Sequence, residues 1–223
     1  MRYPGGKNHT GIFQRIINLI PPHRVYVEGF LGSGAIMRFK SPAPVTIGID
    51  RLAPNPALLQ AGREIIQADF LAWAAAYPWQ GDEFVYLDPP YLHGTRTKKK
   101  MYEFEMTDAD HRRLLRWAVA CPARVLLSGY PSAMYAEALA GWTCDTYRVF
   151  TRAHTWKKEC LWFNYPRPDV LHDLSYLGKD FRERWRNEKR RRNLVGKFLR
   201  LPPLERAALF SALVDVMGGR VNL

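Results

Sequence analysis

Residues 88–91 place a carboxylate, two prolines and an aromatic ring (Asp88-Pro89-Pro90-Tyr91) directly after the apolar run 84–87. Proline fixes φ and restricts the residue before it to extended geometry, so this turn is stiff and offers mainly hydrogen-bond acceptors. A planar exocyclic amine, such as the amino group of adenine, has two N–H groups that the Asp88 carboxylate and the Pro89 carbonyl can accept. These contacts would free the nitrogen lone pair while Tyr91 stacks on the base. The alternative is a strand that simply ends at prolines.

A glycine-rich turn, Glu28-Gly29-Phe30-Leu31-Gly32-Ser33-Gly34, lies between a predicted strand at 24–28 and a predicted helix at 35–40. Glycines at such a turn let the backbone approach a cofactor closely, as in nucleotide-binding α/β folds. The next predicted strand, 45–49, ends in Asp50, whose carboxylate suits the hydroxyls of a ribose. For Asp50, a helix cap is the alternative.

Strands and helices alternate over most of the chain. After a first helix at 11–20, further strands are predicted at 64–67, 83–87 and 123–128, and further helices at 70–77, 107–121 and 131–140. Two strands, 145–151 and 159–165, follow as a pair. This order predicts an α/β, Rossmann-like fold with a mostly parallel sheet and an antiparallel end. A boundary at 166–168 divides a catalytic domain (1–166) from a basic, helical C-terminal extension (167–223).

In their order along the chain, these motifs resemble the Dam-type (D12 class) DNA adenine-N6 methyltransferases. The matching segments are Tyr3-Pro4-Gly5-Gly6-Lys7, 30–34, Asp50, Ala68-Asp69-Phe70, 88–91, Ser128-Gly129-Tyr130 and 159–165. The resemblance covers residues 1–166. It implies a methyltransferase fold, S-adenosyl-L-methionine as the methyl donor, and an adenine of double-stranded DNA as the acceptor, flipped out of the helix.

The resemblance also implies roles for the matching residues. Asp88, Pro89, Pro90 and Tyr91 would hold the target base. Lys7 would lie near the carboxylate of the donor, and Asp69 would bond the amino group of the donor's adenine. For Asp69 an N-cap of the helix at 70–77 is an alternative, and Glu28 is either a solvated acid or a residue that supports the site from behind. The whole donor-binding set is Tyr3, Gly5, Gly6, Lys7, Glu28, Phe30, Gly32, Gly34, Asp50, Asp69 and Phe70.

Two features depart from that family. Gly29 stands where many members have proline, a change that we expect to be tolerated. Only residues 70–87 separate Asp69 from Asp88, so the target-recognition domain usually inserted there has no room. We therefore expect the readout of DNA sequence to come from another part of the chain.

The chain is strongly basic, with 33 Lys and Arg against 21 Asp and Glu and a formal net charge of +12. This balance favours a polyanionic partner. Basic residues concentrate in a predicted loop at 93–102 and in a predicted amphipathic helix within 179–200, for which a merely solvated face is the alternative. Both segments are expected to contact DNA phosphates, through Arg96, Lys98, Lys99, Lys100, Arg186, Lys189, Arg190, Arg191 and Arg192.

Other features of the chain bound the possible classes. The three cysteines and six histidines have no metal-ligand spacing, so no metal is predicted, and reduced thiols fit a cytoplasmic protein. We see no signal peptide and no apolar run long enough to span a bilayer. The last predicted helix, from Pro203, has a wide apolar face that needs cover. Its own catalytic domain can provide it, or a second copy, and we hypothesise a homodimer in which one subunit helps the other to read DNA.

The sequence therefore predicts a site-specific DNA adenine-N6 methyltransferase that acts by direct displacement. One alternative is an RNA adenine methyltransferase with similar donor-site residues. Another is a DNA-binding regulator that retains an inactive methyltransferase fold. The intact set of Lys7, Asp50, Asp69, Asp88 and Tyr91 argues against the inactive fold.

Overall fold

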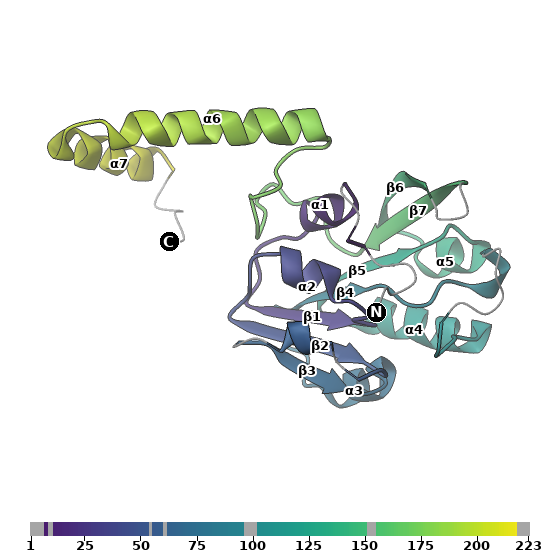
Figure 1. The fold of residues 1–223 in the computed structure, drawn as a ribbon. Coiled ribbons are helices and arrows are strands. Elements are labelled where there is room, and N and C mark those ends of the chain that lie inside the picture. The colour runs from purple at the N-terminus through teal and green to yellow at the C-terminus, as the bar shows by residue number, and fades with distance from the viewer. Residues whose placement is uncertain are drawn as a thin grey trace. The chain divides into compact units, whose positions relative to one another are not determined.

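A seven-stranded sheet forms the centre of the fold (Figure 1). In spatial order its strands are β3 (Glu64–Gln67), β2 (Val45–Asp50), β1 (Val25–Gly29), β4 (Phe84–Leu87), β5 (Arg124–Gly129), β7 (Trp156–Phe163) and β6 (Thr143–Phe150). Strands β1 to β5 are parallel, whereas β7 runs antiparallel to both of its neighbours. The predicted Rossmann-like fold class, with a mostly parallel sheet and an antiparallel end, is confirmed.

Among the residues that the structure describes, one helix precedes the first strand along the chain, and four others lie between successive strands. They are α1 (Ile12–Ile17), α2 (Ala35–Phe39), α3 (Phe70–Ala76), α4 (Asp108–Ala120) and α5 (Ala133–Ala138), with short 3₁₀ turns at Pro56–Leu58 and His93–Thr95. The first helix ends at Ile17 rather than near 20, and the last strand begins at Trp156 rather than 159. The structure describes residues 7–8, 11–53, 55–59, 62–95, 102–150 and 155–217.

The central strands are buried on both faces. All four residues of β4 are at most 1% exposed, and strands β1 and β5 are almost as deeply buried. A parallel strand covered by helices on both sides reads as a continuous apolar run, which is the pattern at 84–87. Burial of this strand fixes the position at which its carboxyl end, and therefore Asp88, emerges from the sheet.

Local signals position the helices that follow the strands. The side chain of Asp69 accepts a hydrogen bond from the Ala72 amide and caps α3, as one of the two interpretations of Asp69 predicted. Thr107 and Asp110 form a reciprocal capping box at the start of α4. These caps set where each helix begins relative to the strand end before it.

The chain divides into two compact units, Met1–Leu174 and Ser175–Leu223. The division falls after the predicted boundary at 166–168, because residues as far along the chain as Asp173 still bond to the first unit. The Tyr165 hydroxyl donates to the Leu19 carbonyl at 2.9 Å, and the His172 amide donates to the Ile20 carbonyl at 2.9 Å. The Asp173 carboxylate accepts the Ser41 amide at 2.8 Å.

The second unit contains α6 (Phe181–Leu199) and α7 (Pro203–Val216). Asp180 caps α6 by accepting the Glu183 amide, and neither helix has a buried residue. On α7 the side chains of Leu204 and Val216 are more than four-fifths exposed. The wide apolar face of the last helix is therefore present, and its cover by a second copy stays a prediction that light scattering can test.

Over the residues that the structure describes, no helix is at once long enough and apolar enough to cross a membrane. The same residues contain no group of three or more His, Cys, Asp or Glu side chains arranged to hold a metal ion. Cys121, Cys144 and Cys160 are free thiols.

Gly29, at the end of β1, leaves the space that the Phe70 ring fills. A Cβ atom at this position would lie 2.5 Å from Phe70 Cδ2 and 2.8 Å from Leu87 Cδ2, so these packed side chains would have to move. We expect Gly29→Ala to lower the free energy of unfolding by about 1–3 kcal/mol, as overpacking of a core does. Urea denaturation measures this change. Gly94→Ala is the control, because a Cβ atom at Gly94 meets nothing within 4 Å, and equal stabilities of the two variants would contradict the prediction.

Candidate functional site

A cavity lies at the carboxyl ends of strands β1 to β4. Its walls include residues that directly follow these strands, such as Phe30 after β1, Arg51 after β2 and Asp88 after β4. In open parallel sheets, ligands bind outside the carboxyl ends of the strands. Six of the residues predicted to hold donor or target line this cavity, namely Phe30, Asp50, Asp69, Phe70, Asp88 and Pro90.

The glycine-rich turn adopts backbone conformations that explain its composition. Gly32 and Gly34 have φ angles of 51° and 59°, in the left-handed region that favours glycine. Phe30 also has a positive φ, of 56°, which is uncommon for a bulky residue. Its ring packs against that of Phe70, with 5.5 Å between the centroids, so the two rings form one wall of the cavity.

Asp50 fastens this turn to the second strand. Its Oδ2 accepts the Gly32 amide at 2.7 Å, and its Oδ1 accepts the Leu52 amide at 2.9 Å. The 3₁₀ turn that follows is capped by Asn55, so Asp50 is not a helix cap. Each carboxylate oxygen has a further lone pair, and Asp50 lines the cavity, so it can also accept hydroxyl groups from a ligand.

Asp69 has two partners within the protein. One oxygen accepts the Ala72 amide at 2.9 Å, and the other accepts Nε of Arg51 at 2.8 Å. Arg51 also lies 5.8 Å from the centroid of the Phe104 ring. Sequence reasoning missed Arg51, because an arginine after a strand-end acid has no distinguishing spacing.

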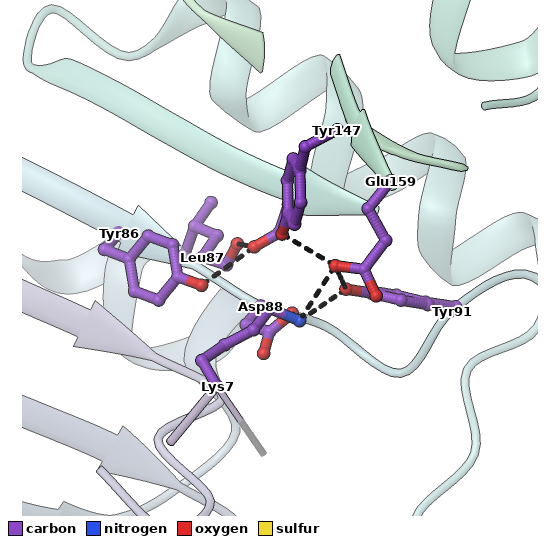
Figure 2. A network of polar contacts seen from close by, with 8 residues as sticks. Lys7, Tyr86, Leu87, Asp88, Tyr91, Tyr147 and Glu159 are labelled. Atoms are coloured by element: carbon purple, nitrogen blue, oxygen red, sulfur yellow. Dashed lines mark hydrogen bonds and ion pairs between the residues drawn. The ribbon is translucent and has the colours of Figure 1, made fainter. Parts of the chain in front are cut away.

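The Asp88 turn receives a lysine from the start of the chain (Figure 2). The Lys7 ammonium donates to Asp88 Oδ1 at 2.9 Å and to the Tyr91 hydroxyl at 2.5 Å. The resemblance placed Lys7 near the carboxylate of the donor, whereas here its ammonium contacts the residues assigned to the target base. Lys7 is only 4% exposed, so its charge depends on these contacts.

Glu159 and Tyr147 complete the network and come from the antiparallel end of the sheet. They are direct cross-strand partners on β7 and β6, and the Tyr147 hydroxyl donates to Glu159 Oε2 at 2.7 Å. The same carboxylate accepts the Tyr91 hydroxyl at 3.3 Å and lies 3.7 Å from Lys7 Nζ (Figure 2). Sequence reasoning noted the segment 159–165 but assigned no role to Glu159, because only the sheet pairing reveals its neighbours.

One ammonium therefore serves two carboxylates in a buried setting. Burial by itself lowers the pKa of Lys7, but the carboxylates of Asp88 and Glu159 outweigh it and raise that pKa above its ordinary value. Burial raises the pKa of Asp88, and Lys7 opposes the rise. Burial also raises the pKa of Tyr91 and of Tyr147, so both phenols keep their protons and donate.

Tyr91 is packed rather than open in this state. Tyr91 is only 6% exposed, and its ring packs edge-on against the Tyr130 ring, with 4.5 Å between the ring centroids. Tyr130 is half-buried and follows β5. A base that enters this region would meet the two tyrosines together.

Glu28 lies behind the glycine-rich turn and does not line the cavity. It is 3% exposed, and its Oε2 accepts the Tyr26 hydroxyl and the Met37 amide, both at 2.8 Å. Burial raises the pKa of Glu28 to about 8. Of the interpretations left open, the structure excludes a solvated acid and places this side chain in support of the first strand and α2.

Part of the cavity lining comes from a segment without a predicted role. It is formed by Tyr102, Phe104, Met106, Asp110 and Arg113, which surround the start of α4. The helix start at Thr107 was predicted from sequence, but no motif marked its neighbours as cavity residues.

Other predicted residues have a different place in the chain or lie outside the described residues. Gly32 and Gly34 shape the glycine-rich turn, and Pro89 is buried. Tyr3, Gly5 and Gly6 lie outside the described residues, as do Arg96, Lys98, Lys99 and Lys100. Arg186, Lys189, Arg190, Arg191 and Arg192 belong to α6 in the second unit.

Comparisons with known proteins give only distant structural similarity. No protein-family model matches the chain, and no curated protein sequence gives a significant match. A solved precorrin 8W decarboxylase from Methanobacterium thermoautotrophicum has 11% identity, with 73% of this chain and 94% of that chain covered and a TM-score of 0.46. The 23S rRNA methyltransferase ErmE has 11% identity, with 84% of each chain covered and a TM-score of 0.43. A dimethyladenosine transferase from Plasmodium falciparum has 10% identity, with 70% and 61% covered and a TM-score of 0.42. Similarity at this level identifies no substrate, which has to be inferred from the site.

The buried carboxyl group of Glu28 should make stability depend on pH. Its folded pKa of about 8 lies above the ordinary 4.5, so the folded state holds a proton that the unfolded state releases between these values. The contribution of Glu28 to the free energy of unfolding is thus fully present below pH 4.5 and is lost as the pH rises to 8. Over this range the free energy of unfolding falls by up to about 1.4 kcal/mol per pH unit.

Glu28→Gln mimics the protonated carboxyl group, so we expect it to flatten this part of the stability profile. Urea unfolding at several pH values from 5 to 8 measures the effect. Glu64→Gln, on exposed β3 surface, is the control and should keep the slope of the unsubstituted protein. Parallel profiles for Glu28→Gln and the unsubstituted protein would contradict the assignment.

Proposed function

We propose that the protein is an S-adenosylmethionine-dependent methyltransferase that methylates the N6 amine of adenine in double-stranded DNA. The observation that carries this proposal is the Asp88 carboxylate at the carboxyl end of β4, bonded to Lys7 at 2.9 Å and facing the cavity. Asp50 and Asp69 line the same cavity at the ends of the neighbouring strands. The proposal thus assigns one end of the site to the acceptor amine and the other to the donor.

The cavity residues fit the nucleoside part of S-adenosylmethionine. A ribose and an adenine amino group present O–H and N–H donors, and Asp50 and Asp69 offer carboxylate acceptors for them. Phe30 and Phe70 provide an apolar wall for the purine. When bound, S-adenosylmethionine supplies an electrophilic methyl group, so the protein needs no nucleophile of its own and mainly orients the acceptor.

Asp88 would act on the acceptor amine directly. Its side chain is 20% exposed, so a ligand can reach it, and as a carboxylate it accepts an N–H of the amine. The paired ammonium of Lys7 favours the ionised form that this contact requires. When the new N–C bond forms, the amine loses one proton, and Asp88 can receive it because burial raises its pKa.

One further proposal follows from the sequence and concerns the DNA. The residues Arg96, Lys98, Lys99 and Lys100 come shortly after the Asp88 turn in the chain, and we propose that they contact the strand beside a flipped base. The same acceptor chemistry fits an adenine of RNA, so RNA is the second substrate that an experiment must include.

Transfer from tritiated S-adenosylmethionine to duplex DNA of mixed sequence, with duplex RNA in parallel, tests the proposed function. We expect label in N6-methyldeoxyadenosine after nucleoside analysis. Asp88→Ala and the isosteric Asp88→Asn should lower the rate by roughly 10²–10³-fold, as loss of a polar transition-state contact does, while donor affinity stays within a few-fold. Label in RNA alone, or an undiminished rate in both Asp88 variants, would overturn the proposal.

Glu159 should act as a positioning residue through its charge. Besides burial, its negative charge contributes to the raised pKa of Asp88. Glu159→Gln removes the charge and keeps the shape, so the acid limb of the pH profile of kcat/KM should move to lower pH. Tyr147→Phe removes only the hydrogen bond to Glu159 and is the matched control, whose acid limb should not move to lower pH. A uniform loss of activity at every pH in Glu159→Gln would instead mean a purely structural role.

A further inference from the structure

We propose that α6 docks on the phosphate backbone of double-stranded DNA through a single basic stripe. The stripe consists of Arg182, Arg186, Lys189, Arg190, Lys197 and Arg200. This inference rests on the proposed nucleic-acid substrate, and it assigns a docking surface outside the candidate site. The first five residues lie within α6, and Arg200 is its C-cap with helical backbone angles.

Helical geometry gathers these six side chains on one side of α6. The helix is uninterrupted over 19 residues, Phe181–Leu199. At about 100° per residue, the six positions fall within an arc of roughly 100°, and they extend over about 27 Å along the axis. All six residues are exposed. The acids Glu183 and Glu188 fall outside this arc, so the stripe has one sign of charge along its length.

The charges of the stripe are not neutralised within the part of the chain that the structure describes. No ion pair joins any of the six described side chains to a carboxylate there, and Lys189 lies over the Trp185 ring at 4.9 Å. By contrast Arg191, which points elsewhere on the helix, pairs with Glu188. Exposed cations without carboxylate partners are the groups that release counterions when they contact DNA phosphates.

The structure thus refines which helix residues we assign to DNA. Of the residues expected from sequence to contact DNA, Arg186, Lys189 and Arg190 belong to the stripe. Arg191 and Arg192 fall outside the arc, whereas Arg182, Lys197 and Arg200 join it. The concentration of positive charge identified the segment 179–200, but only the positions of its basic residues around the helix show which of them share one side.

The distribution of apolar residues favours DNA over an anionic membrane as the partner. A helix that lies in a membrane surface has a broad apolar face opposite its basic face. On α6, charged residues interrupt the side opposite the stripe, namely Arg184, Glu188 and Arg191. Of the exposed apolar residues, Val195 lies on that opposite side among these charges, Phe181 and Leu199 lie between it and the stripe, and Trp185 lies next to the stripe. The apolar side chains of α6 are therefore interspersed with charged ones and do not form a continuous apolar face. A rigid row of cations about 27 Å long suits a duplex backbone, whose charges are spaced about 1.7 Å apart along the axis.

Two triple variants of the full chain test the stripe. Arg186→Gln, Arg190→Gln and Lys197→Gln together remove three charges from its centre. Arg184→Gln, Arg191→Gln and Arg192→Gln remove the same number from outside it and are the matched control. Glutamine has a helix propensity close to those of arginine and lysine, and circular dichroism verifies that both variants keep their helix content.

Fluorescence anisotropy with a labelled DNA duplex, over a series of KCl concentrations, gives the slope of log K against log salt. We expect the stripe variant to bind more weakly and to reduce this slope by about 3, one for each lost phosphate contact, while the control keeps the original slope. Equal losses in both variants would mean a response to net charge alone and would overturn the proposal. An unchanged slope in the stripe variant would overturn it as well.

Further measurements distinguish DNA from other partners and distinguish the docking proposal from the proposed function. Stripe-dependent binding to vesicles with anionic lipid, or to duplex RNA, without stripe-dependent binding to DNA would overturn the proposal. In methyl transfer, the stripe variant should raise the KM for DNA and leave kcat at saturating DNA unchanged. If the unsubstituted protein bound DNA through the stripe yet transferred no methyl group to DNA or RNA, the methylation proposal would fail and the docking surface would stand.

Discussion

A single buried ammonium, shared by two carboxylates, holds the candidate site together. Lys7 bonds to Asp88 at 2.9 Å and lies 3.7 Å from Glu159. An unpaired charge at this depth would be very costly, so each member of the group requires the others. The ammonium comes from the start of the chain, Asp88 from the end of a parallel strand, and Glu159 from the antiparallel hairpin. The site therefore exists only when these three parts of the first unit have assembled.

The sheet supplies the other constraint, which is the alignment of its strand ends. Parallel register brings Gly29 level with Ile49 and with Leu87, so the residues that follow these strands emerge side by side. Asp50 then ties the glycine turn to its own strand by accepting the Gly32 amide. A Rossmann-like sheet in this way places acids from three strands around one cavity without any of them being close in sequence.

The second unit is organised by a different force. The first unit buries a continuous apolar core, whereas α6 and α7 contain no buried residue. Along α6, unbalanced positive charge is the dominant feature, and charge acts over longer distances than packing. The chain thus separates a closely packed unit that contains the candidate site from a unit whose first helix is strongly basic. Phosphate contacts such as those proposed for α6 position a duplex but do not read its bases.

The sequence by itself determined the fold class, the alternation of strands and helices along the chain up to β5, and six of the residues that line the cavity. It could do so because hydrophobic patterns, helix caps and proline-stiffened turns depend on residues that are close together in the sequence. The apolar run 84–87 and the capping residue Asp69 are examples. Only the tertiary structure decided that Lys7 bonds to Asp88 and that Arg51 bonds to Asp69. It also decided that Glu159 and Tyr147 join the hydrogen-bond network around Lys7. These contacts link residues distant along the chain or depend on side-chain direction, so no local pattern encodes them. Likewise, the helical positions that place Arg190 in the basic stripe and Arg191 outside it define a surface only because α6 is one continuous helix.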